Sequence, residues 1–194
     1  MQHYVPMQPD SKRRGVFWGE MTPCDHLVQF YQDDGVLIDS LEGFVGGGIS
    51  AGDGVIVIAT PAHLAALERR LTSQGYNVVA AIAKGQYIAL DAEETLSKFM
   101  RNGWPDDALF ESLVDSLIKR AQIGGRNIRA FGEMVAILWA QGNNGATVRL
   151  EHLWSKLCQL KTFSLFCAYP KSGFTQDASL SIKEICDAHS RYVP

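Results

Sequence analysis

The sequence has few cysteines and no apolar run long enough to cross a membrane. Its four cysteines are widely spaced and form no Cys-x-x-Cys pair, so we expect reduced thiols: Cys24, Cys158, Cys167 and Cys186. No stretch approaches the roughly 20 apolar residues that a membrane-spanning helix requires. Residues 1–20 are polar and lack a signal-peptide core. A cytoplasmic location is therefore expected.

Neither sign of charge is in large excess. The formal net charge is -3 over 194 residues, which gives no general attraction to nucleic acid or to an anionic membrane. We therefore expect neither as a partner. With 46% hydrophobic and 20% charged residues, the composition is that of a globular chain. The length suits one domain with a substantial core.

The glycines do not form a nucleotide-binding loop. The segment Gly46–Ala51 fits G-x-G-x-x-A, but it follows a predicted helix and precedes a strand, whereas phosphate binding needs the reverse order. These glycines are interpreted as the end of that helix. The turn Gln32–Gly35 has the right position, yet it lacks Gly-Lys-Ser/Thr and contains two aspartates that would repel a triphosphate. We expect no cofactor and no ATP hydrolysis.

Strands and helices alternate along the chain, which predicts a three-layer α/β sandwich with a mainly parallel central sheet. Residues 1–23 show no periodicity and are expected to form an irregular arm, leaving 24–194 as one domain. Strands are predicted at 25–31, 54–60, 77–82, 86–90, 128–131 and 163–169. Helices are predicted at 36–45, 61–74, 91–100, 106–123, 134–141, 146–160 and 176–191.

The segment from Arg126 to Trp139 contains two charges that are unexpected beside a buried strand. Arg129 interrupts the apolar run Ile128–Phe131, and Glu133 follows shortly after it. A buried charge is costly unless it is paired. In an open α/β sheet, the carboxyl ends of the strands face the ligand crevice. Two interpretations stay open: an ion pair that closes the strand, or two groups that face a ligand.

A mostly apolar pocket with a few polar groups is the usual site for a small organic molecule. Such a pocket is predicted at the carboxyl ends of the strands, between the turn after Tyr31 and the segment 129–134. The candidate ligand-binding residues are His26, Phe30, Tyr31, Asp33, Arg129, Glu133 and Met134. Alternatively, these side chains form only a core network. No catalytic residue is assigned, because no nucleophile and base lie close together in sequence.

Two short motifs contain thiol and imidazole groups, which suit zinc. They are Cys24-x-His26 and Cys186-x-x-His189, at opposite ends of the chain. We interpret the cysteines as core residues and the histidines as hydrogen-bonded groups, and we assign no metal. Whether the four side chains meet in space stays open. Cys167 lies in a buried strand pattern and is expected to be inert, because apolar burial raises a thiol's pKa.

Several motifs occur in a characteristic order. His26–Tyr31 fits H-x-x-x-[FY]-Y, and further landmarks are 51–60, 90–92, 99–100, 129–134, Trp139, 150–154, 166–170 and 186–189. Together they resemble the MEDS domain, the methanogen/methylotroph sensory domain found in a dichloromethane-responsive regulator and in many sensor kinases. The resemblance covers about residues 24–192.

The resemblance implies a RecA/KaiC-like fold that has lost its phosphate-binding lysine. It also implies a non-enzymatic sensory or regulatory domain that binds a small organic ligand. The sequence contains no appended kinase, receiver or helix-turn-helix module, so we expect signalling in trans to a sensor kinase or another signalling protein. Homo-oligomer formation stays open. The alternative functions are a RecA-like nucleotide-binding protein or ATPase, and a metal or thiol redox sensor.

Overall fold

The computed structural model describes residue 18, residues 21–173 and residues 179–194. A six-stranded sheet of order β3-β2-β6-β7-β1-β8 forms its centre, and every pairing in this sheet is parallel. The strands are β1 (His26–Tyr31), β2 (Gly54–Ala59), β3 (Tyr87–Asp91), β6 (Ile128–Gly132), β7 (Ser164–Pro170) and β8 (Arg191–Val193). The short strands β4 (Met100–Arg101) and β5 (Trp104–Pro105) form a separate antiparallel pair.

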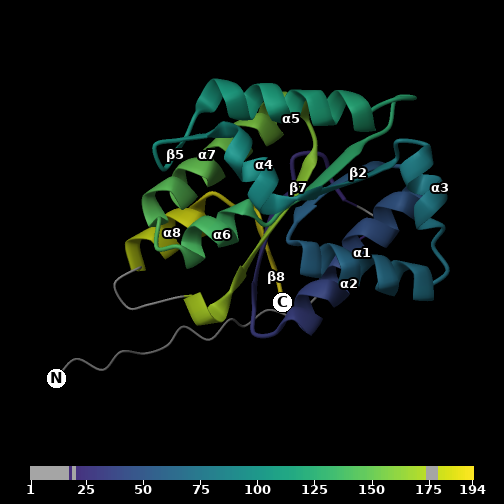
Figure 1. Cartoon of the computed structure of the whole chain (residues 1–194), viewed down its shortest axis with the longest axis horizontal. Coiled ribbons are helices and arrows are strands. Elements are labelled where there is room, and N and C mark those ends of the chain that lie inside the picture. Colours follow the sequence, from purple (N-terminus) through teal and green to yellow (C-terminus); the bar gives the residue numbers. More distant parts are fainter. Residues whose placement is uncertain (1–17, 19–20, 174–178) are drawn as a thin grey trace.

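Helices cover both faces of the sheet (Figure 1). One layer contains α1 (Asp34–Ala51), α2 (Pro61–Ser73) and α3 (Val78–Ala83). The other contains α4 (Ala92–Phe99), α5 (Asp107–Ala121), α6 (Met134–Ala140), α7 (Asn144–Lys161) and α8 (Ser179–Asp187). A 3-10 turn, η1 (Lys171–Gly173), follows β7. The predicted three-layer α/β sandwich with a parallel sheet is confirmed, and the RecA/KaiC relationship stays a prediction.

Strand β2 shows why the centre of the sheet is hydrophobic on both faces. Val55 and Val57 pack into the core under α1, whereas Ile56 and Ile58 pack into the core under α5. Successive side chains of a strand point to opposite faces, so a strand covered by helices on both sides needs a continuous apolar run. Such a run gives the strand a clear signal in the sequence.

The predicted strand at residues 77–82 is wrong, because this segment forms α3. Asn77 begins the helix, and its side chain accepts a hydrogen bond from the Ala80 N–H at 2.9 Å. Val78 and Ala81, three residues apart, are buried, whereas Val79 is 75% exposed. Helical spacing buries one stripe here, and the short apolar run contains no alternation that would favour a strand.

The interpretation of residues 46–48 as a helix end is also wrong, because α1 continues to Ala51 and ends at Gly52. The glycines permit close packing instead. A Cβ at Gly46 would lie 2.6 Å from the Tyr76 ring, and one at Gly48 would lie 2.8 Å from Val55 Cγ2. Small residues are therefore needed where α1 packs against Tyr76 and against β2.

The two ends of the domain are only partly described. The arm predicted for residues 1–23 lies largely outside the described residues, but Trp18 packs against Phe44 and Phe166 with ring centres 5.7 Å from each. The helix predicted at 176–191 is shorter, since α8 ends at Asp187 and β8 follows it, and residues 176–178 lie outside the described part.

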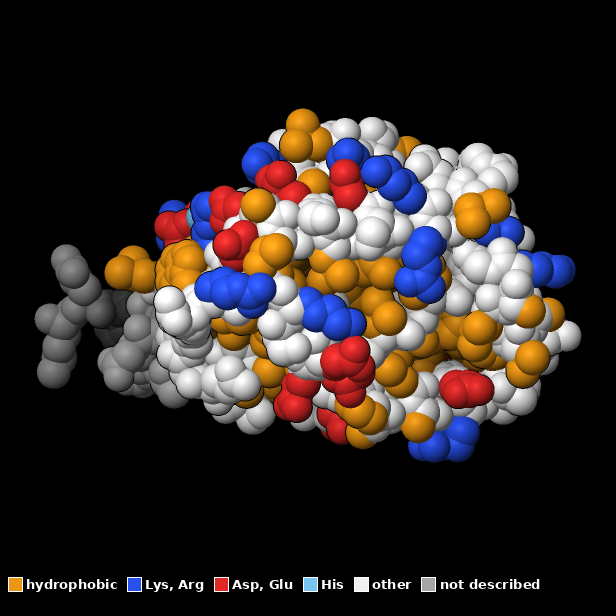
Figure 2. All heavy atoms as spheres, turned by 45° about the horizontal axis from the view of Figure 1, so that its top comes forward, with side chains coloured by type: hydrophobic (Ala, Val, Ile, Leu, Met, Phe, Trp, Pro, Cys, Tyr) orange, Lys and Arg blue, Asp and Glu red, His pale blue; other side chains and the backbone are white. Residues whose placement is uncertain are grey.

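The surface combines charged and apolar areas. Figure 2 shows hydrophobic side chains gathered along the middle of one face, with basic and acidic side chains on either side. Beside the edge strand β3, a groove is lined by Ile82, Tyr87, Ile88, Leu90 and Ile123. No helix in the described part of the chain is both long enough and apolar enough to cross a bilayer.

Candidate functional site

Glu133 organises a polar cluster at the carboxyl ends of β1, β2 and β6. Its two carboxylate oxygens accept hydrogen bonds from the Thr60 N–H at 2.8 Å and from His63 Nδ1 at 2.7 Å. His63 Nε2 lies 3.5 Å from Asp34 Oδ1. Tyr31 completes what we call the carboxyl-edge cluster: Tyr31, Asp34, His63 and Glu133. These contacts hold the His63 ring in one orientation at the sheet edge.

Charge and burial oppose each other at His63 but act in the same direction at Tyr31. The hydrogen bond to Glu133 raises the pKa of His63, although burial acts in the opposite direction. The pKa of Tyr31 is raised chiefly by burial and further by the negative charges of Glu133 and Asp34. The cluster therefore favours a protonated His63 and a neutral Tyr31.

The other predicted residues of this region have more local roles. The Asp33 carboxylate accepts a hydrogen bond from the Val36 N–H at 3.2 Å and caps α1. Met134 is fully buried at the start of α6. The half-buried Phe30 ring lies on the opposite face of the sheet from Tyr31 and stacks on Tyr169, with ring centres 5.9 Å apart.

The predicted grouping of Arg129 with Glu133 and His26 is wrong. Arg129 lies near the amino end of β6 and points toward α1, where its Nε is 2.6 Å from Asp53 Oδ2. Its guanidinium also donates a hydrogen bond to the Trp18 carbonyl. Glu133 has different partners at the other end of the strand. The two residues therefore form neither an ion pair with each other nor a common pocket.

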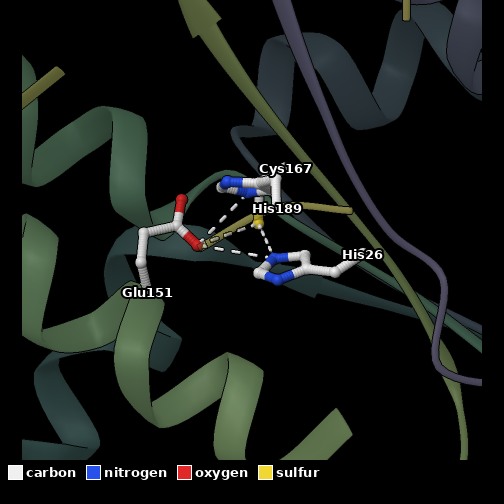
Figure 3. Close-up of side chains that lie close together, drawn as sticks. All are labelled: His26, Glu151, Cys167 and His189. Atoms are coloured by element: carbon white, nitrogen blue, oxygen red, sulfur yellow. Dashed lines mark hydrogen bonds and ion pairs between the residues drawn. The ribbon is translucent and has the colours of Figure 1, made fainter. Parts of the chain in front are cut away.

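His26 belongs to a second polar group inside the core, which we call the buried centre: His26, Glu151, Cys167 and His189 (Figure 3). His26 begins β1, Glu151 lies on α7, Cys167 lies on β7, and His189 precedes β8. One side-chain atom of each residue lies within 4.8 Å of the others. Glu151 is completely buried. Imidazole, carboxylate and thiolate groups are the usual protein ligands of zinc, so these residues could hold a metal ion.

Burial sets the direction of the pKa shifts of Cys167 and His189, whereas the neighbouring side chains set that of Glu151. Burial alone would raise the pKa of Glu151, but His189, His26 and the Tyr169 hydroxyl together lower it to about 2. The pKa of Cys167 is raised well above its usual range by burial and by the nearby carboxylate, as expected for this thiol. Burial also lowers the pKa of His189.

The sequence identified only part of this centre. His26 and His189 do meet, with ring centres 3.9 Å apart. The two cysteines of their motifs do not join them: Cys24 Sγ donates to the Cys158 carbonyl, and Cys186 is a half-buried residue of α8 outside the centre. Glu151 and His63 were missed as site residues. A glutamate on the buried face of α7, between Leu150 and Trp154, was the available signal for Glu151.

The chain matches a known family of domains. A family model described as MEDS, the methanogen/methylotroph, DcmR sensory domain, matches residues 25–190. This range includes both polar groups described above. A search of curated proteins finds no match.

Proposed function

The chain belongs to the MEDS family of sensory domains, and from that premise we propose that it binds a small organic ligand and signals through a partner protein in trans. The location of the carboxyl-edge cluster is the observation that supports ligand binding. Ligands of open α/β sheets bind at the carboxyl ends of the strands. The cluster presents oriented polar groups from three strand ends there.

His63 is the proposed contact to the ligand's polar group. Its Nδ1 is engaged by Glu133, which leaves Nε2 facing Asp34 at 3.5 Å. The Asp34 side chain is 74% exposed, so a ligand can replace this contact without opening the core. Glu133 would then orient the ring and maintain its protonation.

We propose no enzymatic role. Asp33 and Asp34 occupy the strand-to-helix turn where a phosphate-binding loop would need a lysine and a hydroxyl. Asp33 already caps α1, so its carboxylate occupies the helix end that would otherwise attract an anion. The purified chain should release no phosphate from ATP and magnesium. Sustained release that Glu133→Gln abolishes would contradict this proposal.

The ligand proposal is tested by calorimetry and thermal shift with defined probes. Dichloromethane, short alcohols and short carboxylates are suitable, because each combines a small apolar body with at most one polar group. A probe that stabilises the native chain should lose its effect in His63→Gln and Glu133→Gln. His152→Gln is the control, because the His152 side chain is 51% exposed on α7. Equal binding by all variants would refute the site, and no binding of any probe would count against this ligand class.

A further inference from the structure

Four ligand atoms, from β1, α7, β7 and the segment between α8 and β8, converge inside the core (Figure 3). His26 Nε2 lies 3.5 Å from Glu151 Oε2 and 3.6 Å from Cys167 Sγ. Glu151 Oε2 in turn lies 3.6 Å from Cys167 Sγ and 3.5 Å from His189 Nε2. Tetrahedral zinc, with bonds of about 2.0–2.3 Å, separates its ligand atoms by roughly 3.3–3.8 Å. These four of the six separations fall in that range, and the other two are within 4.8 Å.

The hydrogen bonds around His26 direct a lone pair toward the convergence point. The Ser155 hydroxyl donates to the Ala188 carbonyl at 3.0 Å, so its oxygen accepts from His26 Nδ1 at 3.1 Å. Nδ1 therefore carries the proton of the neutral ring, and Nε2 is free to act as a ligand. A second hydrogen bond of this kind is the usual means of orienting a metal-bound histidine.

His189 is oriented in the same way. Its Nδ1 lies 2.6 Å from the Ile185 carbonyl, which can only accept, so Nδ1 carries the proton. The side chain is completely buried, and among the described residues Nε2 makes no hydrogen bond, although Glu151 Oε2 lies 3.5 Å from it. A buried polar atom without a partner is costly, and it needs a physical reason. A cation at the convergence point supplies that reason.

Glu151 and Cys167 supply the negative charge. The Tyr169 hydroxyl donates to Glu151 Oε1, which leaves Oε2 facing the two imidazoles and the thiol. Metal binding would release the Cys167 thiol proton to solvent, so one carboxylate, one thiolate and two neutral imidazoles together would carry two negative charges. They neutralise a divalent cation, so the loaded centre has no net charge to bury.

We propose that His26, Glu151, Cys167 and His189 bind one divalent transition-metal ion, and that zinc is the best match. Metal binding by the buried centre would be separate from the proposed binding of an organic ligand by the carboxyl-edge cluster. Sulfur and imidazole ligands disfavour magnesium and calcium, which prefer oxygen. Four protein ligands complete a tetrahedral shell, which is typical of structural zinc sites.

Metal binding at this site would also hold the segment between α8 and β8 in place against β1. His189 precedes β8, and the next residue, Ser190, exchanges backbone and side-chain hydrogen bonds with His26 at 2.8–3.1 Å. A metal bound to both histidines would therefore hold the segment between α8 and β8 against β1.

The alternative to a metal ion is a proton. If His26 or His189 were protonated, its contact with Glu151 would be an ion pair. The two explanations differ at Cys167, because a proton network needs no thiolate whereas the metal site uses it as a ligand. Cys167→Ala removes only the sulfur and keeps the imidazoles and the carboxylate. This variant should therefore fold without metal and separate the two explanations.

The test is a cobalt(II) titration of the full chain after treatment with a chelator. The native chain should bind one equivalent, with the visible absorption of tetrahedral cobalt and a thiolate-to-cobalt charge-transfer band, and zinc should displace the cobalt. Cys167→Ala should lose the charge-transfer band. Its cobalt affinity should fall by more than the roughly 10–100-fold that follows loss of an orienting group.

Two further variants complete the test. His189→Gln should likewise weaken binding, whereas the exposed His152→Gln should leave the spectrum and the affinity unchanged. If His189→Gln does not fold, Cys167→Ala decides the result. The proposal is overturned if the folded native chain binds no stoichiometric cobalt or zinc. It is equally overturned if Cys167→Ala binds cobalt with the native spectrum and affinity.

Discussion

Arg129→Met should lower the free energy of unfolding by about 3–5 kcal/mol, because it leaves the Asp53 carboxylate buried without a partner. The two side chains are 3% and 10% exposed, and the atoms Nε and Oδ2 are 2.6 Å apart. The guanidinium also lies 5.9 Å from the centre of the Phe44 ring. Because domains have a total stability of about 5–15 kcal/mol, this loss is easily measured.

Urea unfolding followed by circular dichroism measures the effect. Arg149→Met is the matched control, since Arg149 and Asp107 form a pair whose side chains are 38% and 45% exposed. It should cost no more than about 1 kcal/mol. The double variant Arg129→Met/Asp53→Asn should cost less than the sum of its single changes. A loss from Arg129→Met no larger than that of the control would refute the assignment of a buried ion pair.

Three further predictions concern His63, Gly48 and Cys158. The pKa of His63 is raised in the folded state by Glu133, so its stabilising contribution is fully present below about pH 6.5 and is lost as pH rises through the folded pKa. His63→Gln should flatten this part of the pH profile of urea stability, and an unchanged profile would contradict the pairing. Gly48→Ala should cost about 1–3 kcal/mol by overpacking against Val55, whereas the exposed Ser50→Ala should change stability by under about 0.5 kcal/mol in the same assay. Burial raises the pKa of Cys158 to about 12, so it should resist alkylation of the native protein near neutral pH while the exposed Cys24 reacts. Equal labelling rates by mass spectrometry would argue against this burial.

The central sheet could be predicted because its strands have strong local signals. β2 is a continuous β-branched run, and helices of crossover length separate it from its neighbours. Residues 77–82 were assigned wrongly because the run of six apolar residues at 78–83 contains neither a clear period of two nor one of 3.6. The glycines at 46–48 were misjudged for another reason. Glycine can end a helix or permit close packing, and only the tertiary contacts with Tyr76 and Val55 distinguish the two.

The candidate sites depended even more on tertiary structure. Glu133 was located correctly at a strand end, because a charge directly after an apolar strand is visible in the sequence. Its partner His63 is 70 residues away in sequence, and no local pattern connects them. Likewise, His26 and Cys167 are separated by 141 residues and meet only because β1 pairs with β7. Sequence spacing placed His26 with Cys24 and His189 with Cys186, which we interpreted as core groups, whereas the structure places Cys167 beside His26.

X-ray absorption at the zinc edge of the zinc-loaded chain tests most directly whether the buried centre is a metal site. One sulfur at about 2.3 Å and three nitrogen or oxygen ligands at about 2.0–2.2 Å are predicted. Cys167→Ala should remove the sulfur contribution alone. A shell made only of oxygen and nitrogen in the native chain would contradict coordination by Cys167, and with it the assignment of the centre.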